Sequence, residues 1–405
     1  MSVLTSESFL SRTDRETSAL IASEPNSSGK VARPSKLSLW KLNRTVVLYS
    51  CCAAFNSVLL GFDLGVMGGV VFVVKKQMAL SEWQVGVVMG VLEVVAIFGT
   101  FVAGYISDRY GRTRSMLVAA ILFFIGGIVL IASTGFIGLV LGRIITGAGV
   151  GIGISVDPLY ISEISPKEYR GQLVTFSEIS INIGITLGYF TGWVFSSYDA
   201  SFSWRLMLSV GVILPLLMMV LCLKVMDETP RYLMKIGESR RALGVLLTLS
   251  NTEDEANATF LEIKGAIEND LELSRSPWRE LLCSSRPVVR RMLVVVSVVA
   301  AAQQLSGVDG IMGYMLFNLK QGGVDSPNDL FGIQLAMGVV KTSVLLLSAD
   351  AIDEKYGRRK LLFVSAIGCS ISHVIVAFGS WVSWAWLETI GFFLYAIAFS
   401  VGLGP

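Results

Sequence analysis

The chain has 405 residues, of which 53% are hydrophobic and only 16% are charged, and its net charge is +2. Soluble domains average about 25% charged residues, so this composition excludes an ordinary soluble domain. The small net charge, without a long basic run, gives no support for nucleic-acid binding. Long apolar runs recur from about residue 45 onward, each close to the roughly 20 residues that cross a bilayer as a helix. These features predict an all-α, polytopic membrane protein.

The first 44 residues differ from the rest of the chain, because they are rich in Ser, Thr and charged residues. They contain no apolar segment of the signal-peptide type, so residues 1–44 are predicted to be a disordered cytoplasmic tail. Six apolar runs follow within residues 45–226, and we predict that they form an N-terminal six-helix bundle. The predicted spans are 45–74, 83–106, 115–132, 137–161, 173–195 and 204–226.

A long polar segment, residues 227–291, separates these spans from the next apolar runs. It is charged and rich in helix-forming residues, so it is predicted to be a cytoplasmic loop with short amphipathic helices at the membrane surface. Four more spans are predicted within residues 292–405: 292–319, 330–352, 360–381 and a tenth that begins near Trp384.

Basic residues mark one side of the membrane. They lie in the tail and in the loops 107–114, 165–170, 227–291 and 354–360. Because loops rich in Lys and Arg stay in the cytoplasm, the N-terminus is predicted to be cytoplasmic. The plasma membrane is the predicted location.

The stretch Leu141–Gly171 places an arginine, Arg143, inside an apolar run and leaves that run as a charged loop. An arginine in the centre of a span costs about 3 kcal/mol or more, so it needs a partner or a water-filled cavity. Asp63, in the first span, is also costly when charged. Glycines at 147, 149, 151 and 153 let another helix approach closely. These residues predict a packed pair of charges within the membrane.

Two loops share a pattern of acid, base, Tyr, Gly, Arg and base. They are DRYGRTR at 108–114 and EKYGRRK at 354–360, each two spans into its half of the chain. Equivalent loops in equivalent places indicate a duplicated six-helix unit, as many transporters have.

Seven short stretches between residues 55 and 405 carry a resemblance to a known family: GYISDRYGR (104–112), GR (142–143), PLYISEISPKEYRG (158–171), SWR (203–205), ETPRYL (228–233), QQLSGVD (303–309) and YGRRK (356–360). Together they resemble the sugar porter family of the major facilitator superfamily, and within it most closely the plant polyol/monosaccharide–proton symporters. The closer match depends on Glu178, Asp309 and Lys341, where hexose porters carry Gln, Asn and Asn. The resemblance implies two six-helix bundles around a central cavity, alternating access, and transport rather than enzyme catalysis.

By the same resemblance, Asp63 and Arg143 match the helix-one acid and the helix-four arginine of proton-coupled members. If alternating access lengthens their contact, the carboxylate gains a proton on one side of the membrane and loses it on the other. Asp63 and Arg143 are therefore the predicted proton-coupling pair. The alternative is a static ion pair that joins two helices.

A polyhydroxylated ligand needs several oriented hydrogen-bonding groups among apolar walls. The glycine-broken segment 303–309 supplies such groups, and an aromatic residue follows it. Hydrogen bonding between helices is the alternative for Gln303, Gln304 and Asp309. For the charged set of Glu178, Asp309 and Lys341, the alternative is a polar network whose charges neutralise one another. Glu93 and Asp157 depart from the family pattern and are predicted to be local packing groups or cavity-facing groups rather than a second proton site. The predicted binding residues for a small polyol or monosaccharide are Glu178, Gln303, Gln304, Asp309, Tyr314 and Lys341.

Charged side chains also gather where the predicted spans reach the cytoplasm. Opposite charges from two loops can latch the inner ends of helices in the outward-facing state, so that inward opening breaks them. The alternative is that the basic residues only mark topology. The predicted gate residues are Asp108, Arg109, Arg112, Glu163 and Arg170 in the first half, and Glu228, Arg231, Glu354, Arg358 and Arg359 in the polar segment and second half.

The sequence predicts no cofactor and no metal. It contains no nucleotide-binding P-loop and no nucleophile–base pair, and its five cysteines and single histidine show no metal-ligand spacing. The cysteines lie mostly in apolar runs and are expected to be reduced.

The tenth predicted span ends at GLGP, where the resemblance implies two further helices and a second charged loop. Residues 292–405 are therefore predicted to be an incomplete C-terminal bundle, with about ten of the usual twelve helices in the whole chain. The predicted function is proton-coupled transport of a polyol or monosaccharide. The alternatives are a truncated, non-transporting product, either degraded or associated with the full-length transporter, and a facilitative sugar uniporter.

Overall fold

The computed structural model describes residues 43–273, 287–351, 358–382 and 384–404, and these residues form helices and loops without a strand. Ten helical segments in this part of the chain are long and apolar enough to cross a membrane, counting α12 and α13 as one. The all-α prediction is confirmed, and each predicted span falls on one of these segments. They are α2 (Arg44–Gln77), α3 (Glu82–Tyr110), α4 (Arg112–Ala132), α5 (Phe136–Ile164), α6 (Arg170–Phe195), α7 (Ala200–Lys224), α12 (Pro287–Leu305), α13 (Val308–Gln321), α14 (Pro327–Ala351), α15 (Arg358–Val382) and α16 (Ala385–Gly402).

Helix α2 is the most buried of the spanning helices and packs along α5, α6 and α7. Glycines make the contact with α6 close: a Cβ on Gly61 would lie 1.9 Å from the Ile181 carbonyl oxygen, and one on Gly65 would lie 2.4 Å from that of Ile185. Small residues allow backbones to approach in this way inside a membrane, where packing rather than hydrophobic burial drives association. The α2–α6 contact therefore depends on these glycines.

We expect Gly61→Ala to destabilise the protein by about 1–3 kcal/mol, because the added methyl group overlaps backbone that a side-chain rotation cannot move. Gly90→Ala on α3 is the matched control, since nothing lies within 4 Å of the Cβ it adds. Thermal unfolding in detergent measures both. Equal midpoints for the two variants would contradict the close α2–α6 contact.

The predicted seventh span is two helices, α12 and α13, that meet at Ser306 and Gly307. Gly307 has φ of +76°, which lies in the left-handed region that side chains other than glycine rarely adopt. The break places the predicted binding residues 303 and 304 on α12 and residue 309 at the start of α13.

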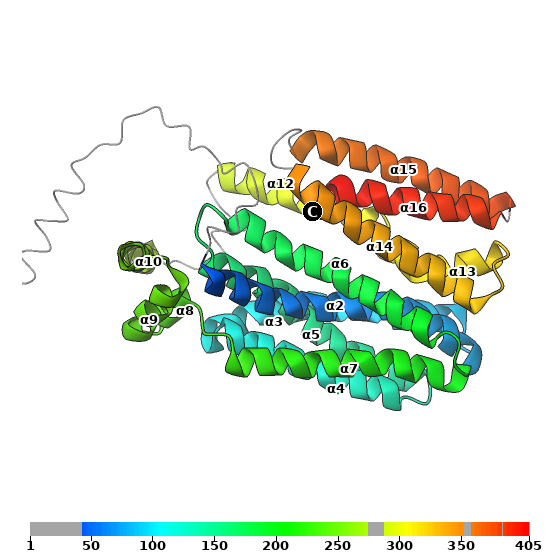
Figure 1. Ribbon diagram of the computed structural model, residues 1–405, viewed down its shortest axis with the longest axis horizontal. Helices are drawn as coiled ribbons and strands as arrows, with labels where there is room; N and C mark the ends of the chain where they lie inside the picture. The colour runs from blue at the N-terminus through cyan, green and yellow to red at the C-terminus, as the bar shows by residue number, and fades with distance from the viewer. Residues whose placement is uncertain (1–42, 274–286, 352–357, 383, 405) are drawn as a thin grey trace, which may run out of the picture. The chain divides into compact units, whose positions relative to one another are not determined.

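Helices α13 and α14 connect the second half of the chain to the first, α13 against α2 and α14 along α6 (Figure 1). The ring of Phe331 fills the space beside two glycines, so that a Cβ would lie 2.7 Å from it at Gly69 and 2.9 Å at Gly192. Farther along α14, the hydroxyls of Thr342 and Thr186 lie 2.9 Å apart.

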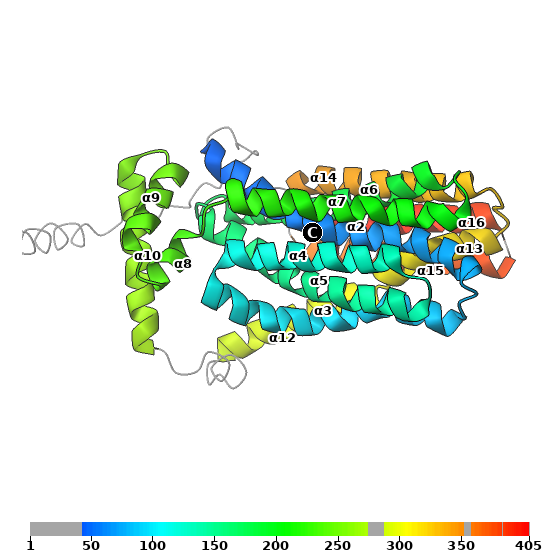
Figure 2. The ribbon, with the colours of Figure 1, turned by 90° about the horizontal axis from the view of Figure 1, so that it is seen from below.

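Residues 227–273, the part of the polar segment described before the gap at 274–286, hold three helices: α8 (Pro230–Lys235), α9 (Ser239–Leu249) and α10 (Glu253–Leu273). They lie at one end of the spanning helices (Figure 2), called here the α8–α10 end. Asn43 ties the start of α2 to this end, because its Nδ2 donates to the carbonyls of Thr248 and Ser250 at 2.9 Å. Since Gly69 lies near the other end of α2, the Phe331 contact is remote from the α8–α10 end. The prediction of short helices was wrong for α10, whose 21 residues contain no proline to interrupt them.

Candidate functional site

Arg143 on α5 and Asp63 on α2 lie in contact, with the guanidinium Nη1 donating to Asp63 Oδ2. Arg143 is 2% exposed, and its Nε donates to the Val88 carbonyl of α3 at 3.1 Å. Glycines on α5 make room for this geometry: a Cβ on Gly147 would lie 2.8 Å from the Leu92 carbonyl oxygen of α3. The structure thus brings together the two intramembrane charges that the sequence singles out, inside the first half of the chain.

The second carboxylate oxygen of Asp63 has no hydrogen bond among the described residues. Asp63 lines a small cavity between α2, α4, α5 and α7, and Thr146 is the other residue of the lining with a polar side chain. The Thr146 hydroxyl donates within α5, to the carbonyls of Gly142 and Arg143. The space within the cavity that the centre of a water molecule can occupy is ≈ 20 Å³. About 10–15 Å³ of such space is enough to hold one water. One oxygen of Asp63 is therefore bound to Arg143, and the carboxyl group borders a space that a single water fits.

Three predicted substrate residues, on α6, α13 and α14, interact through their charges. Lys341 is 6% exposed, and both Glu178 and Asp309 act on its ammonium electrostatically. Neither carboxylate lies within 4 Å of Lys341 Nζ, which instead lies 3.5 Å from the Met312 sulfur and 5.4 Å from the centre of the Phe399 ring. The ammonium is thus buried within electrostatic range of two carboxylates without a direct ion pair to either.

The two glutamines differ in their surroundings. Gln303 Nε2 donates to the Leu403 carbonyl at the end of α16, at 2.8 Å, so this amide joins two helices. Gln304 is exposed. Tyr314 is half-buried, its ring centre is 6.0 Å from that of Phe317, and its hydroxyl lies 3.8 Å from the position of a Cβ on Gly86 of α3.

Glu93 on α3 was not among the predicted site residues, yet it interacts electrostatically with Asp309, Arg143 and Asp63. Glu93 is therefore within electrostatic range of both the buried ion pair of the first half and Asp309 of the second. The sequence did carry the signal, since an acidic residue inside an apolar run is costly without a function or a partner.

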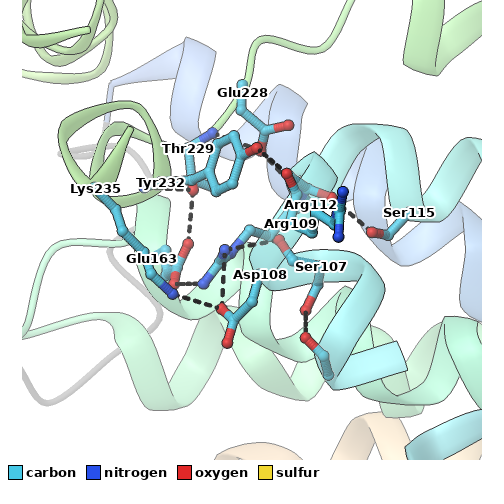
Figure 3. A network of polar contacts seen from close by, with 12 residues as sticks. Ser107, Asp108, Arg109, Arg112, Ser115, Glu163, Glu228, Thr229, Tyr232 and Lys235 are labelled. Carbon is cyan, nitrogen blue, oxygen red and sulfur yellow. Dashed lines mark hydrogen bonds and ion pairs between the residues drawn. The ribbon is translucent and has the colours of Figure 1, made fainter. Parts of the chain in front are cut away.

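A network of polar contacts joins the turn between α3 and α4 to the end of α5 and to the start of the polar segment (Figure 3). Arg112 Nη2 lies 2.9 Å from Glu163 Oε1, and Glu163 Oε2 accepts a hydrogen bond from the Thr229 hydroxyl at 2.6 Å. Asp108 lies 3.6 Å from Arg112 Nη1 and 3.2 Å from Lys235 Nζ of α8. These five residues form the α8–α10-end cluster, in which charges alternate in sign.

Glu228 completes this cluster through the backbone, because its Oε1 accepts from the Arg112 N–H at 2.8 Å. The backbone reaches it at Gly111, which has φ of +98° and whose Cβ, if present, would lie 2.2 Å from Glu228 Oε2. Burial raises the pKa of the Glu228 carboxyl above its ordinary value, although the N–H groups of Thr229, Arg112 and Thr113 and the charge of Arg112 act in the opposite direction. The glycine of DRYGRTR is therefore needed both for the turn and for this carboxylate.

The remaining predicted gate residues are not among those named above, although the Arg109 carbonyl accepts from the Tyr232 hydroxyl at 2.9 Å within the network of Figure 3. Arg109 donates to the Tyr105 hydroxyl at 2.7 Å, and Arg170 and Arg231 are exposed at the starts of α6 and α8. The predicted contact between Glu228 and Arg359 is not made in this conformation: Glu228 is held by the α3–α4 turn, and the Arg359 guanidinium lies over the Phe363 ring at 5.9 Å. Glu354 and the Arg358 side chain lie outside the described residues. Helix geometry explains the difference, because residue 228 follows α7, which packs on α4 within the first half.

Comparison with known proteins places this geometry in a family. The model of the family "Sugar (and other) transporter" matches residues 49–405. The chain is 37% identical over 374 residues to Probable polyol transporter 4 of Arabidopsis thaliana, covering 90% of this chain and 70% of that protein. It is 32% identical over 388 residues to Polyol transporter 5 of the same plant, covering 90% and 71%.

Solved structures agree. The partially occluded inward-open structure of the xylose transporter XylE from E. coli matches with a TM-score of 0.76 and 25% identity over 89% of this chain and 85% of that one. The proton:xylose symporter XylE bound to 6-bromo-6-deoxy-D-glucose matches with a TM-score of 0.73 and 26% identity, covering 90% and 81%. These relatives are transporters and not enzymes. The chain belongs to the sugar porter family of the major facilitator superfamily.

Proposed function

We propose that this sugar porter carries a small polyol or monosaccharide together with protons, by alternating access. The observation that carries the proposal is the buried contact between Asp63 and Arg143. Relatives named as polyol transporters support the substrate class, and the likeness to a protein described as a proton:xylose symporter supports the coupling.

Asp63 is the member of the pair that exchanges a proton, because a guanidinium stays protonated at physiological pH. A charged Asp63 is held to Arg143, since leaving either charge unpaired in the membrane is costly. A proton on Asp63 removes that attraction. Arg143 then separates from Asp63 and retains its hydrogen bond to the Val88 carbonyl. The bordering cavity gives the carboxyl group room for one water once the contact opens.

The main proposed substrate contacts are Lys341, Glu178 and Asp309, which can hydrogen-bond to the hydroxyl groups of the substrate. A sugar hydroxyl both donates and accepts, so one hydroxyl can accept from the ammonium while donating to a carboxylate. The absence of a direct ion pair among these three described residues leaves the ammonium with only a thioether and an aromatic ring as near partners. A polyol placed between them satisfies all three groups.

Of the two glutamines, Gln304 is the better proposed contact, because the amide donor of Gln303 is engaged by Leu403. Tyr314 is proposed to wall the site toward α3, where its hydroxyl faces Gly86. Glu93 joins the proposed site through its interaction with Asp309.

The two halves are proposed to be residues 45–226 and 292–405, joined by the cytoplasmic segment 227–291, with the N-terminus cytoplasmic and the protein in the plasma membrane. The hydrogen bonds and ion pairs of the α8–α10-end cluster, among described residues, stay within α3–α5 and residues 228–235. We therefore propose that the gate works by moving this cluster as a unit against the second half. The contacts of Phe331, remote from this end, fit a conformation that is open toward the cytoplasm.

Uptake of radiolabelled sorbitol into transport-deficient yeast tests the proposal. Cells that display the protein at their surface are expected to accumulate sorbitol above empty-vector cells, to alkalinise an unbuffered medium, and to lose accumulation with a protonophore. Surface-displayed protein without uptake of sorbitol or xylose would reject the substrate class. Uptake that only equilibrates, without alkalinisation, would identify a facilitative uniporter instead.

A further inference from the structure

Helices α2 and α5 share a second buried polar contact, nearer the α8–α10 end than the Asp63–Arg143 pair. Asp157 of α5 is 0% exposed. Its Oδ1 accepts from Asn56 Nδ2 and its Oδ2 lies within hydrogen-bond distance of the Ser57 hydroxyl, both at 2.9 Å. The contact is tight, because a Cβ on the neighbouring Gly153 would lie 2.5 Å from Asn56 Nδ2. Every near polar partner of Asp157 therefore comes from α2.

In the part of the chain that the structure describes, no cation balances this carboxyl group. The described residues place no Lys, Arg or His nitrogen within 4 Å of Asp157, and no charged group on the helices around α5 acts on it. The titratable group that faces it from α7 is the thiol of Cys222, while α2 supplies only the neutral Asn56 and Ser57. This surrounding differs from that of Asp63, which has a guanidinium in contact.

A charged carboxylate in such a place loses its hydration without gaining a counter-ion, whereas the protonated acid pays far less on burial. The neutral acid also satisfies the geometry. Its carbonyl oxygen accepts from Asn56 Nδ2, and its O–H donates to Ser57 Oγ over the same 2.9 Å, since a hydroxyl accepts as well as donates. The hydrogen-bond distances thus fit the neutral acid, and full burial without a counter-ion favours it over the carboxylate.

The position of this contact indicates what it does. Asn56 lies about two helical turns before Asp63 along α2, and beyond it the hydroxyls of Tyr49 and Tyr160 both bind Asp227 at 2.8 Å. On α5, Pro158 follows Asp157 and cannot donate to the Ile154 carbonyl, which weakens the helix at this point. Interactions from α2 therefore hold α5 where its own backbone ladder is interrupted.

We propose that Asp157 keeps its proton throughout transport and acts as a positioning residue, a neutral carboxylic acid that fixes α2 against α5 while the Asp63–Arg143 contact opens and closes. The role of the contact in transport rests on the proposed proton coupling at Asp63. With α2 and α5 fixed here, opening of that pair proceeds by side-chain movement rather than by separation of the two helices.

Asp157→Asn is the first test, because asparagine keeps the shape, accepts from Asn56 and donates to Ser57. We expect unchanged accumulation of sorbitol and an unchanged dependence of uptake on external pH. Asp157→Val, which keeps a similar volume but no hydrogen bond, is expected to lower accumulation. A loss of coupling or a displaced pH profile in Asp157→Asn would overturn the proposal, because Asp157 would then be a second proton carrier.

Infrared spectroscopy of the purified protein supplies a readout that does not depend on transport. At neutral pH the wild type is expected to show the carbonyl stretch of a protonated carboxylic acid, buried and slow to shift in heavy water, which Asp157→Asn removes. Identical spectra of the two would refute the neutral acid. If sorbitol uptake proves uncoupled from protons, the proposed function fails at Asp63 while this spectral difference remains.

Discussion

Asp63→Asn is expected to abolish the accumulation of substrate, so that its concentrations on the two sides of the membrane become equal. With one proton per substrate and a membrane potential of about 100 mV, the wild type is expected to accumulate substrate about 50-fold. One proton that crosses about 100 mV supplies about 2.3 kcal/mol, and about 1.4 kcal/mol corresponds to a tenfold concentration ratio. Asparagine keeps the shape of Asp63 and still accepts from Arg143, but it carries no proton between the two sides. Downhill exchange of labelled for unlabelled sorbitol is therefore expected to persist.

The measurement uses proteoliposomes with an imposed potential and a pH gradient, in which accumulation and exchange are followed separately. Glu82→Gln is the matched control: it makes the same change of carboxylate to amide at an exposed residue that is paired with Lys75 at the start of α3. The control is expected to accumulate sorbitol like the wild type. Accumulation that survives Asp63→Asn would exclude Asp63 as the proton carrier.

The number and placement of the spanning helices could be predicted from sequence, because apolar length alone sets a bilayer span. The turn at Gly111 could also be predicted, because a glycine among basic residues is typical of a short cytoplasmic loop. The structure agrees, since Gly111 has φ of +98°, which glycine adopts readily. The partner of Arg143 was predictable for a different reason. Few groups can neutralise a cation in an apolar span, and Asp63 was one of the few available.

Partners in polar regions were not predictable in this way. The sequence offers many basic residues as possible partners of Glu228. The packing of α7 on α4 alone determines that Glu228 accepts from the Arg112 N–H. Asp157 shows the same limit inside the membrane. Its partners Asn56 and Ser57 are neutral residues without a charge signal, and the register of α2 against α5 alone brings them together.

Arg112→Met is expected to destabilise the protein by about 3–5 kcal/mol, because it leaves Glu163 as a buried charge without its cation. The side chain of Glu163 is 5% exposed and that of Arg112 is 7% exposed, so water does not replace the lost partner. The Thr229 hydroxyl remains bound to Glu163 and offsets only part of the loss. Denaturant unfolding in detergent, followed by tryptophan fluorescence, measures the change.

The double variant Arg112→Met/Glu163→Gln is expected to recover part of this stability, since the unpaired charge is then removed as well. Arg109→Met provides the control three residues away: Arg109 is exposed and bound to Tyr105, so its loss is expected to cost less than about 1 kcal/mol. Similar losses at positions 109 and 112 would mean that charge alone, marking topology, explains DRYGRTR. A much larger loss of stability at position 112 than at position 109, with recovery in the double variant, would show that the Arg112–Glu163 contact holds the end of α5 against the α3–α4 turn. A gate that moves as a unit requires this contact.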